Sequence, residues 1–154
     1  MRVFIDTSVF IRHYYGVDES IKLLNFALNE NDAVISPNVV EETFFKLLYI
    51  ETERIFGKTG KHTVKNRLKK HREKFRNVER YMNDFIFESI ESGIVDLMDT
   101  NHEILRRSIE IGFRYGLLPN DALIAATCRH YGINKIATFD EDFKRVDFLE
   151  IIRA

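Results

Sequence analysis

Short apolar runs alternate with longer segments of helical periodicity along most of the chain. The first run covers residues 2–6, and later runs cover 33–35, 94–97, 135–138 and 149–152. Runs of this length without polar alternation are typical of strands that are buried on both faces of a parallel sheet. The pattern therefore predicts an α/β fold with a central, mainly parallel sheet.

Between these runs, apolar residues recur three and four positions apart, which is the spacing of one helix face. Helices are expected after the first run with Thr7 or Ser8 as N-cap, over 18–29, from Pro37, from Thr100 to near Gly116, and from Pro119 to Tyr131. Two apolar faces are predicted in detail: Val39, Val40, Phe44, Leu47 and Leu48, and Ile104, Leu105, Ile109 and Ile111. From His62 to Ile90, one long helix or two consecutive helices are expected, ending at Gly93.

Four acidic residues stand at the ends of these predicted elements. Asp6 and Asp140 follow strands, Glu42 lies about one turn into a helix, and Asp121 lies in the first turn of another. In open α/β sheets, ligands bind beyond the carboxyl ends of the strands. Carboxylates gathered there raise one another's pKa unless a cation joins them, and Mg²⁺ or Mn²⁺ prefers such oxygen ligands.

The pair Glu41-Glu42 offers two carboxylates, of which only one can face a given pocket. Neighbouring residues on a helix point about 100° apart. Val39 and Phe45 flank the face of Glu42, so we expect Glu42 to point inward.

Three or four carboxylates around hard cations suit metal-assisted hydrolysis of phosphodiesters, because the metal generates hydroxide from water and stabilises the leaving oxygen. Thr7, Ser8, Asn120 and Thr138 are expected to orient the carboxylates or waters. Taken singly, each acidic motif is a helix cap, a turn or a solvated face more often than a catalytic group. Their joint occurrence favours a site.

Composition narrows the class of protein. The chain has 154 residues, of which 45% are hydrophobic and 31% charged, as expected for one domain with a single core. No apolar run approaches the roughly 20 residues needed to span a bilayer, and the N-terminal run is too short for the core of a signal peptide. The single Cys128 excludes an intrachain disulfide, and no Cys/His zinc pattern occurs. We therefore expect a cytoplasmic protein with no membrane partner.

Basic residues are concentrated between Gly57 and Arg76, whereas the rest of the chain is acidic. This segment holds one acid, Glu73, and nine basic residues: Lys58, Lys61, Lys65, Arg67, Lys69, Lys70, Arg72, Lys74 and Arg76. The remaining 14 basic and 23 acidic residues carry a balance of −9, and together with the segment they give the net charge of −1. The segment contacts RNA phosphates or forms a solvated face of a helical hairpin that supports a dimer, and both interpretations stay open. Candidate RNA-binding residues are Lys65, Arg67, Lys69, Lys70 and Arg72.

Four stretches together resemble the PIN-domain family, and in particular its VapC-like toxin ribonucleases. They read VFIDTSV at 3–9, SPNVVEE at 36–42, NDALIAAT at 120–127 and ATFDEDF at 137–143. The resemblance implies a three-layer α/β/α fold in a single domain over 1–154. The segment between the second and third acids is longer than is typical of that family, so a basic helical elaboration is expected around 57–90.

The resemblance also implies a function and a set of site residues. It implies an endoribonuclease that depends on Mg²⁺ or Mn²⁺, with an RNA substrate, an antitoxin protein as partner, and a homodimeric state. Carried over by position, the catalytic and metal-binding acids are Asp6, Glu42, Asp121 and Asp140, with Asp142 as an auxiliary metal ligand.

Three other functions compete with this one. The first is a nuclease of RNA maturation or decay without an antitoxin, and the second is a non-catalytic or weakly active RNA-binding module. The third, a flavodoxin-like cofactor domain, has no Gly-rich phosphate loop to support it. Phe44, Phe45, Phe85 and Phe87 are expected in the core or in a dimer interface.

Overall fold

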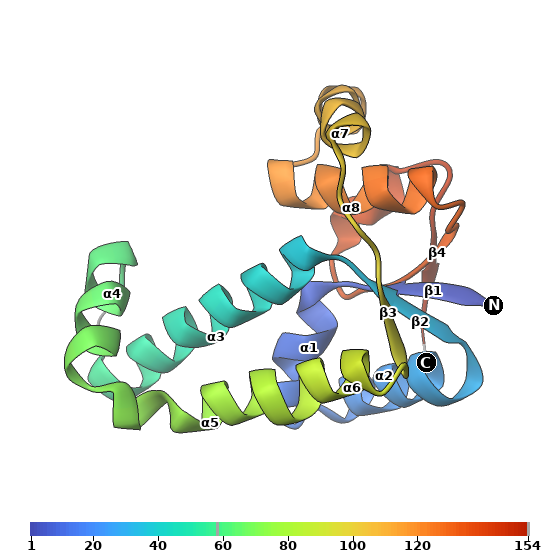
Figure 1. Cartoon of the computed structure of the whole chain (residues 1–154). Coiled ribbons are helices and arrows are strands. Elements are labelled where there is room, and N and C mark those ends of the chain that lie inside the picture. The colour runs from blue at the N-terminus through green and yellow to red at the C-terminus, as the bar shows by residue number, and fades with distance from the viewer. Residues whose placement is uncertain (58, 154) are drawn as a thin grey trace.

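The computed structural model describes residues 1–57 and 59–153, and its centre is a parallel sheet (Figure 1). The strands lie in the order β3-β2-β1-β4-β5, and every neighbouring pair is parallel. They are β1 (Arg2–Ile5), β2 (Asp32–Ile35), β3 (Val95–Leu97), β4 (Lys135–Ala137) and β5 (Glu150–Ile152). The predicted α/β class is confirmed, and the described sheet is wholly rather than mainly parallel.

Helices cover both faces of this sheet, which gives the predicted three layers (Figure 1). In the view of Figure 1, α7 (His102–Tyr115) and α8 (Pro119–His130) lie above the sheet. Below it lie α1 (Thr7–Tyr14), α2 (Asp18–Glu30) and α6 (Glu88–Glu91). The middle strands are therefore buried on both sides, and the side chains of Val3, Phe4, Ile5, Val34 and Ile136 have no exposed surface.

A helical arm extends from the sheet between β2 and β3. It runs outward along the 20-residue α3 (Pro37–Phe56), turns at α4 (Lys61–Lys70), and returns along a continuous helix from α5 (Arg76–Arg80) to α6 (Figure 1). A 3₁₀ turn, η1 (Arg72–Phe75), separates α4 from this return helix, and a π-helical stretch, η2 (Tyr81–Phe87), lies within it. Of the two predicted arrangements, the one with two helices is therefore correct.

A buried carboxylate fastens α1 to α3. The hydroxyls of Tyr14 and Tyr15 each donate to Glu51 at 3.3 Å, and Arg54 forms an ion pair with it at 2.5 Å. These bonds lower the pKa of Glu51, with the Arg54 hydrogen bond as the largest cause. A buried charge is tolerated only when it is paired in this way. The contact holds together α1, which carries Thr7 in its first turn, and α3, which carries Glu42 in its second turn.

The first strand is one residue shorter than predicted because Asp6 leaves the strand to cap the following helix. The backbone N–H of Asp6 still pairs with Ala137 at 3.0 Å, but its side chain caps α1 by accepting from Ser8 N–H. The expected N-caps Thr7 and Ser8 are therefore wrong, since both lie inside the helix. A carboxylate is as good an N-cap as a hydroxyl.

The predicted apolar face of α7 is wrong at two positions. Ile104 and Ile111 are buried against α8, but Leu105 is 49% exposed and Ile109 is 65% exposed. With Phe113, which is 89% exposed, they form a stripe at four-residue spacing on the opposite side of the helix. Periodicity shows that two sides of α7 are apolar, whereas α8 covers only one of them.

Phe44 was expected on the buried face of α3, but its side chain is 44% exposed. Phe45 and Phe87 are also exposed, so these three residues do not lie in the core, and their alternative position in a dimer interface stays a prediction; Phe85 stacks on His13. Phe44 lines an apolar groove of about 600 Å³ on the arm, formed with Leu48, Leu68, Phe75, Met82, Phe87 and Leu97 among others. Across residues 1–57 and 59–153, no helix has the length and apolar character required to cross a membrane.

Candidate active site

Acidic residues from separate elements meet at the carboxyl edge of the sheet. Asp6 directly follows β1, and Asp140 comes three residues after β4, the parallel neighbour of β1. Glu42 lies in the second turn of α3, which follows β2 after the single residue Ser36, and Asp121 lies in the first turn of α8. Parallel strands place their carboxyl ends on one edge, so chain order alone brings these acids together.

Asp6 is 4% exposed and is held by two hydroxyls. Ser8 Oγ donates to its Oδ2 at 2.6 Å, and Thr138 Oγ1 donates to the same oxygen at 2.7 Å. Each hydroxyl also accepts a backbone N–H, from Phe139 at 3.0 Å and from Asp140 at 2.9 Å. Burial raises the pKa of Asp6 and the charge of Glu42 adds to this, while the hydrogen bonds oppose it. The network thus fixes Asp6 and the chain leading to Asp140.

Glu42 is bound on both carboxylate oxygens. Its Oε2 accepts hydrogen bonds from Thr7 Oγ1 at 2.8 Å and from the side-chain amide of Asn120. Its Oε1 forms an ion pair with Lys46 Nζ at 2.9 Å. Glu41 points elsewhere, to the wall of the apolar groove. Glu42 is therefore the inward acid of the pair, and it joins the first turns of α1 and α8 to α3.

The N-terminal turns of α3 and α8 are linked by a pair of asparagines. Asn38 Nδ2 donates to Asn120 Oδ1 at 2.9 Å, and Ser36 Oγ donates to Asn38 Oδ1 at 2.5 Å. Each asparagine follows a proline at the start of its helix, and Pro37 and Pro119 are the two prolines of the chain. The Oδ1 of Asn120 thus accepts a hydrogen bond from Asn38, and its Nδ2 donates one to Glu42.

The acidity of Asp121 is strongly perturbed by its surroundings. Burial, followed by the charges of Asp6, Asp140 and Glu42, raises the pKa of Asp121 to about 7, and Lys46 acts in the opposite direction. This ordering places Asp121 among the other three acids. A carboxyl with such a pKa is half protonated near neutral pH until a cation replaces the proton.

A compact group of possible metal ligands consists of Asp121, Asp140 and Asp142. One carboxylate oxygen from each lies within 4.8 Å of the others. Asp140 caps η3 (Glu141–Arg145), because its Oδ1 accepts the backbone N–H of Asp142 at 2.8 Å. This bond holds Asp142 beside Asp140, while Arg145 forms an ion pair with Asp142 at 3.3 Å. The trio includes the auxiliary acid expected from the sequence.

The donor set fits a hard divalent cation. All ligands are carboxylate oxygens, which Mg²⁺ and Mn²⁺ prefer, and no sulfur or imidazole joins the described trio. Burial and then the repulsion of the neighbouring acids raise the pKa of Asp121 to about 7, as expected of ligands that need a cation between them. Asp6 and Glu42 lie outside the compact trio but act on Asp121 through their charges.

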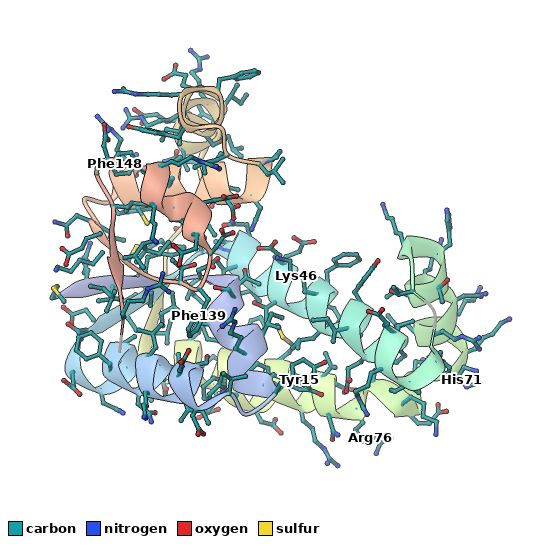
Figure 2. All side chains as sticks on the ribbon, turned by 180° about the vertical axis from the view of Figure 1, so that it is seen from behind. Tyr15, Lys46, His71, Arg76, Phe139 and Phe148 are labelled. Atoms are coloured by element: carbon teal, nitrogen blue, oxygen red, sulfur yellow. The ribbon has the colours of Figure 1, made fainter. Side chains whose placement is uncertain are left out.

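The predicted RNA-binding residues do not reach this site. Lys65, Arg67, Lys69 and Lys70 lie on α4, Arg72 lies on η1, and Lys58 falls outside the described residues. In Figure 2, His71 and Arg76 mark the outer end of the arm, whereas Lys46 lies near its sheet end. At 1.5 Å per residue, the stretch of α3 from Glu42 to Phe56 is about 21 Å long.

Sequence reasoning missed three contributors to the site: Asn38, Lys46 and Arg145. Asn38 had a signal, since the dipeptide Pro-Asn opens both helices that meet at the site. Lys46 and Arg145 had only the spacing of ordinary helix-surface ion pairs, four and three residues from their partners.

The raised pKa of Asp121 predicts a pH-dependent loss of stability without metal. An unfolded Asp titrates near 3.8, so the folded state binds the proton more tightly, and the free energy of unfolding falls as pH rises from about 4 to about 7. Asp121→Asn removes this loss. After allowance for solvent screening, we expect a gain of roughly 1–2 kcal/mol at pH 8 and a smaller gain at pH 5.

Urea denaturation in EDTA at both pH values would measure this difference. Asp147→Asn, at an exposed acid outside the site, is the control and should show no gain at pH 8. An equal effect of Asp121→Asn at the two pH values would contradict the raised pKa.

Comparison with known proteins agrees with this geometry. The family model described as PIN domain matches residues 3–149. Ribonuclease VapC6 of Methanocaldococcus jannaschii is 40% identical over 152 residues, covering 98% of this chain and 96% of that protein. The structure of Mycobacterium tuberculosis VapC20, a Sarcin-Ricin loop cleaving toxin, has a TM-score of 0.64 at 19% identity and covers 99% of both chains.

A toxin-antitoxin complex from Klebsiella pneumoniae also has this fold. Its matching chain has a TM-score of 0.61 at 16% identity, with 97% of this chain and 95% of that chain covered. The predicted three-layer architecture is therefore confirmed by solved structures as well as by the sheet order. The family match covers β2, β3, β4 and all of β1 except Arg2, and it ends just before β5. The chain belongs to the PIN domain family.

Proposed function

We propose that this chain is a metal-dependent endoribonuclease that hydrolyses RNA phosphodiester bonds and acts as the toxin of a toxin–antitoxin pair. The main supporting observation is that Asp121 lies close enough to Asp6, Asp140 and Glu42, at one edge of the sheet, for their charges to raise its pKa in addition to burial. A relative that is 40% identical over nearly the whole chain is named a ribonuclease, which supports RNA as the substrate.

The proposed cofactor is Mg²⁺ or Mn²⁺, held by Asp121, Asp140 and Asp142 with Asp6 and Glu42 beside them. When bound, such a cation supplies Lewis-acid activation of the attacking water and stabilises charge on the leaving oxygen. Binding displaces the proton that Asp121 holds near neutral pH. The affinity for the cation should therefore rise with pH through about 7.

The remaining residues keep the acids in place. Ser8 and Thr138 both donate to one oxygen of Asp6, so its carboxylate has a fixed direction. Thr7 and Asn120 do the same for Glu42. Such outer hydrogen bonds orient metal-binding carboxylates. We assign Thr7, Ser8, Asn120 and Thr138 this positioning role.

The proposed protein partner is an antitoxin. The support comes from the toxin-antitoxin complex whose chain has this fold, and from the toxin described for VapC20. The proposal places the enzyme in the cytoplasm with its RNA. A small protein encoded beside this chain that blocks its cleavage would distinguish a toxin from a nuclease of RNA maturation or decay.

A second function, binding of RNA phosphates, is proposed for the outer end of the arm. Lys65, Lys69, Lys70 and Arg72 are exposed there, whereas the guanidinium of Arg67 stacks on Phe56 at 4.5 Å. A cluster of exposed cations gives RNA affinity that depends on salt and not on sequence. The arm would then bind RNA at a distance from the acids.

A homodimer is proposed from two apolar surfaces. The exposed stripe Leu105, Ile109 and Phe113 on α7 is convex, whereas the groove along α3 and η2 is concave. Two copies related by a two-fold axis can fill each other's groove, so one contact is made twice. Arg106 beside the stripe complements Glu41 and Glu79 of the groove wall.

Replacement of a site acid should abolish cleavage without unfolding the protein. We expect Glu42→Gln and Asp121→Asn to slow cleavage of a mixed-sequence RNA in Mn²⁺ or Mg²⁺ by about 100-fold or more. EDTA should stop the parent. Glu41→Gln changes the adjacent residue on the same helix and should cleave like the parent. Cleavage by Asp121→Asn at the parent rate would refute the site, and a folded parent that binds but never cuts RNA would favour the non-catalytic alternative.

Charge reversal on the arm should weaken RNA binding and its salt dependence. In an Asp121→Asn background, which prevents cleavage, Lys69→Glu with Lys70→Glu removes two phosphate contacts. The slope of log affinity against log salt should fall by about 1.4 for single-stranded RNA. The double change Arg2→Glu with Lys22→Glu alters net charge equally, and it should leave fluorescence-anisotropy binding almost unchanged. Equal effects of the two pairs would assign the affinity to net charge.

A charge placed in the α7 stripe should separate the dimer. We expect Phe113→Asp to be monomeric by light scattering after size exclusion, because burying an unpaired carboxylate in an apolar groove is unfavourable. Val17→Asp, a similar change at another exposed apolar residue, should remain dimeric. A parent that is monomeric would overturn the dimer, and a dimeric Phe113→Asp would overturn this interface.

A further inference from the structure

Lys46 is a cation at the edge of the acidic site. It lies on α3 one turn after Glu42, with its Nζ 2.9 Å from Glu42 Oε1. Its side chain is 51% exposed, whereas that of Glu42 is 19% exposed. Figure 2 shows Lys46 near the end of α3 that lies by the sheet, away from the basic end of the arm. Its ammonium is thus open to solvent on one side and faces the acids on the other.

The contact differs from an ordinary pair on a helix surface because three acids act on one lysine. Burial lowers the pKa of Lys46, but the hydrogen bond and charge of Glu42 and the charges of Asp6 and Asp121 together raise it. In return, Lys46 opposes the rise in the pKa of Asp121. These acids come from the end of β1, from α3 and from α8. Lys46 is therefore close to the centre of the site and not only to its helix neighbour.

The bonding of Glu42 leaves Lys46 free to change partners. Thr7 and Asn120 hold Oε2, so the carboxylate keeps its direction whether or not Lys46 contacts Oε1. An ammonium has three N–H donors on a flexible stem, and Glu42 uses one of them. Among the ion pairs of the described residues, only Lys46 and Arg145 contact predicted site acids, and Arg145 contacts the outermost, Asp142.

We propose that Lys46 is a phosphate-binding residue of this site, whose ammonium contacts a non-bridging oxygen of the phosphodiester that is cut. This inference rests on the proposed ribonuclease function and adds a residue to it. Carboxylates repel a phosphate, so a site made of acids needs positive charge on the substrate side. Lys46 supplies such a charge at a fixed place on α3.

The proposal has two consequences of opposite sign. Without RNA, the ammonium competes with a divalent cation for the same carboxylates, so its removal strengthens metal binding. With RNA, the ammonium stabilises the phosphate, so its removal weakens RNA binding and slows cleavage. A residue that merely supported α3 would not separate these effects, because its loss would loosen the acids and weaken both.

Three variants test this: Lys46→Gln, Lys46→Arg, and Lys22→Gln as a matched loss of charge on α2. Calorimetric titration with Mn²⁺ in the absence of RNA should show Lys46→Gln binding roughly fivefold more tightly than the parent. Cleavage by Lys46→Gln at saturating Mn²⁺ should be about 100-fold slower. Lys46→Arg should retain most cleavage, and Lys22→Gln should match the parent in both assays.

RNA binding provides a readout that does not depend on cleavage. In the Asp121→Asn background, adding Lys46→Gln should weaken anisotropy-measured affinity for a mixed-sequence RNA roughly fivefold. Weaker Mn²⁺ binding by Lys46→Gln would overturn the proposal in favour of helix support. Tighter Mn²⁺ binding with unchanged RNA binding and cleavage would overturn the phosphate contact and leave a counter-ion. The parent and Asp121→Asn, run together, report separately on the ribonuclease function itself.

Discussion

Repulsion among carboxylates brought to one edge of a parallel sheet is the constraint on which the rest of this structure depends. Topology places Asp6, Glu42, Asp121 and Asp140 together, and the molecule then stabilises them by hydrogen bonds and by one ammonium. The stabilisation is uneven. Asp6 and Glu42 are bound by hydroxyl, amide or ammonium donors, whereas burial together with repulsion from the other acids raises the pKa of Asp121 to about 7. The repulsion around Asp121 that these donors do not offset favours the binding of a cation there.

Three of the side chains that donate to these acids, Thr7, Ser8 and Asn120, lie where helices begin, so the fold itself positions them. Ser8 and Thr7 lie in the first turn of α1, Asn38 in that of α3, and Asn120 in that of α8. A side chain in a first turn is held by the helix behind it and points toward the loop edge of the sheet. Precision at the site therefore follows from the packing of α1, α3 and α8, including the Glu51 contact that joins the first two.

Strand ends and helix starts were predictable because apolar runs and proline mark them, so the positions of Asp6, Asp121 and Asp140 followed from the sequence. Glu42 could be chosen over Glu41 from its apolar flanks. Lys46 could not be found, since a Glu and a Lys four residues apart occur on many exposed helices. Leu105 and Ile109 were misplaced because periodicity does not show how many sides of a helix are covered. The distance from the basic segment to the acids depended on the length and direction of α3, which no local pattern shows.

That length has a consequence for how the molecule can vary. The 20 residues of α3 form one uninterrupted helix with the acids near its start and the basic α4 beyond its end. Each added residue would move α4 outward by about 1.5 Å and rotate it by about 100° around the helix axis. The distance of α4 from the acids and its orientation around the axis of α3 therefore change together. Only insertions of about a whole turn keep the basic face of α4 in the same direction relative to the acidic site. The distance between the basic segment and the acids can therefore change in steps of about 5.4 Å.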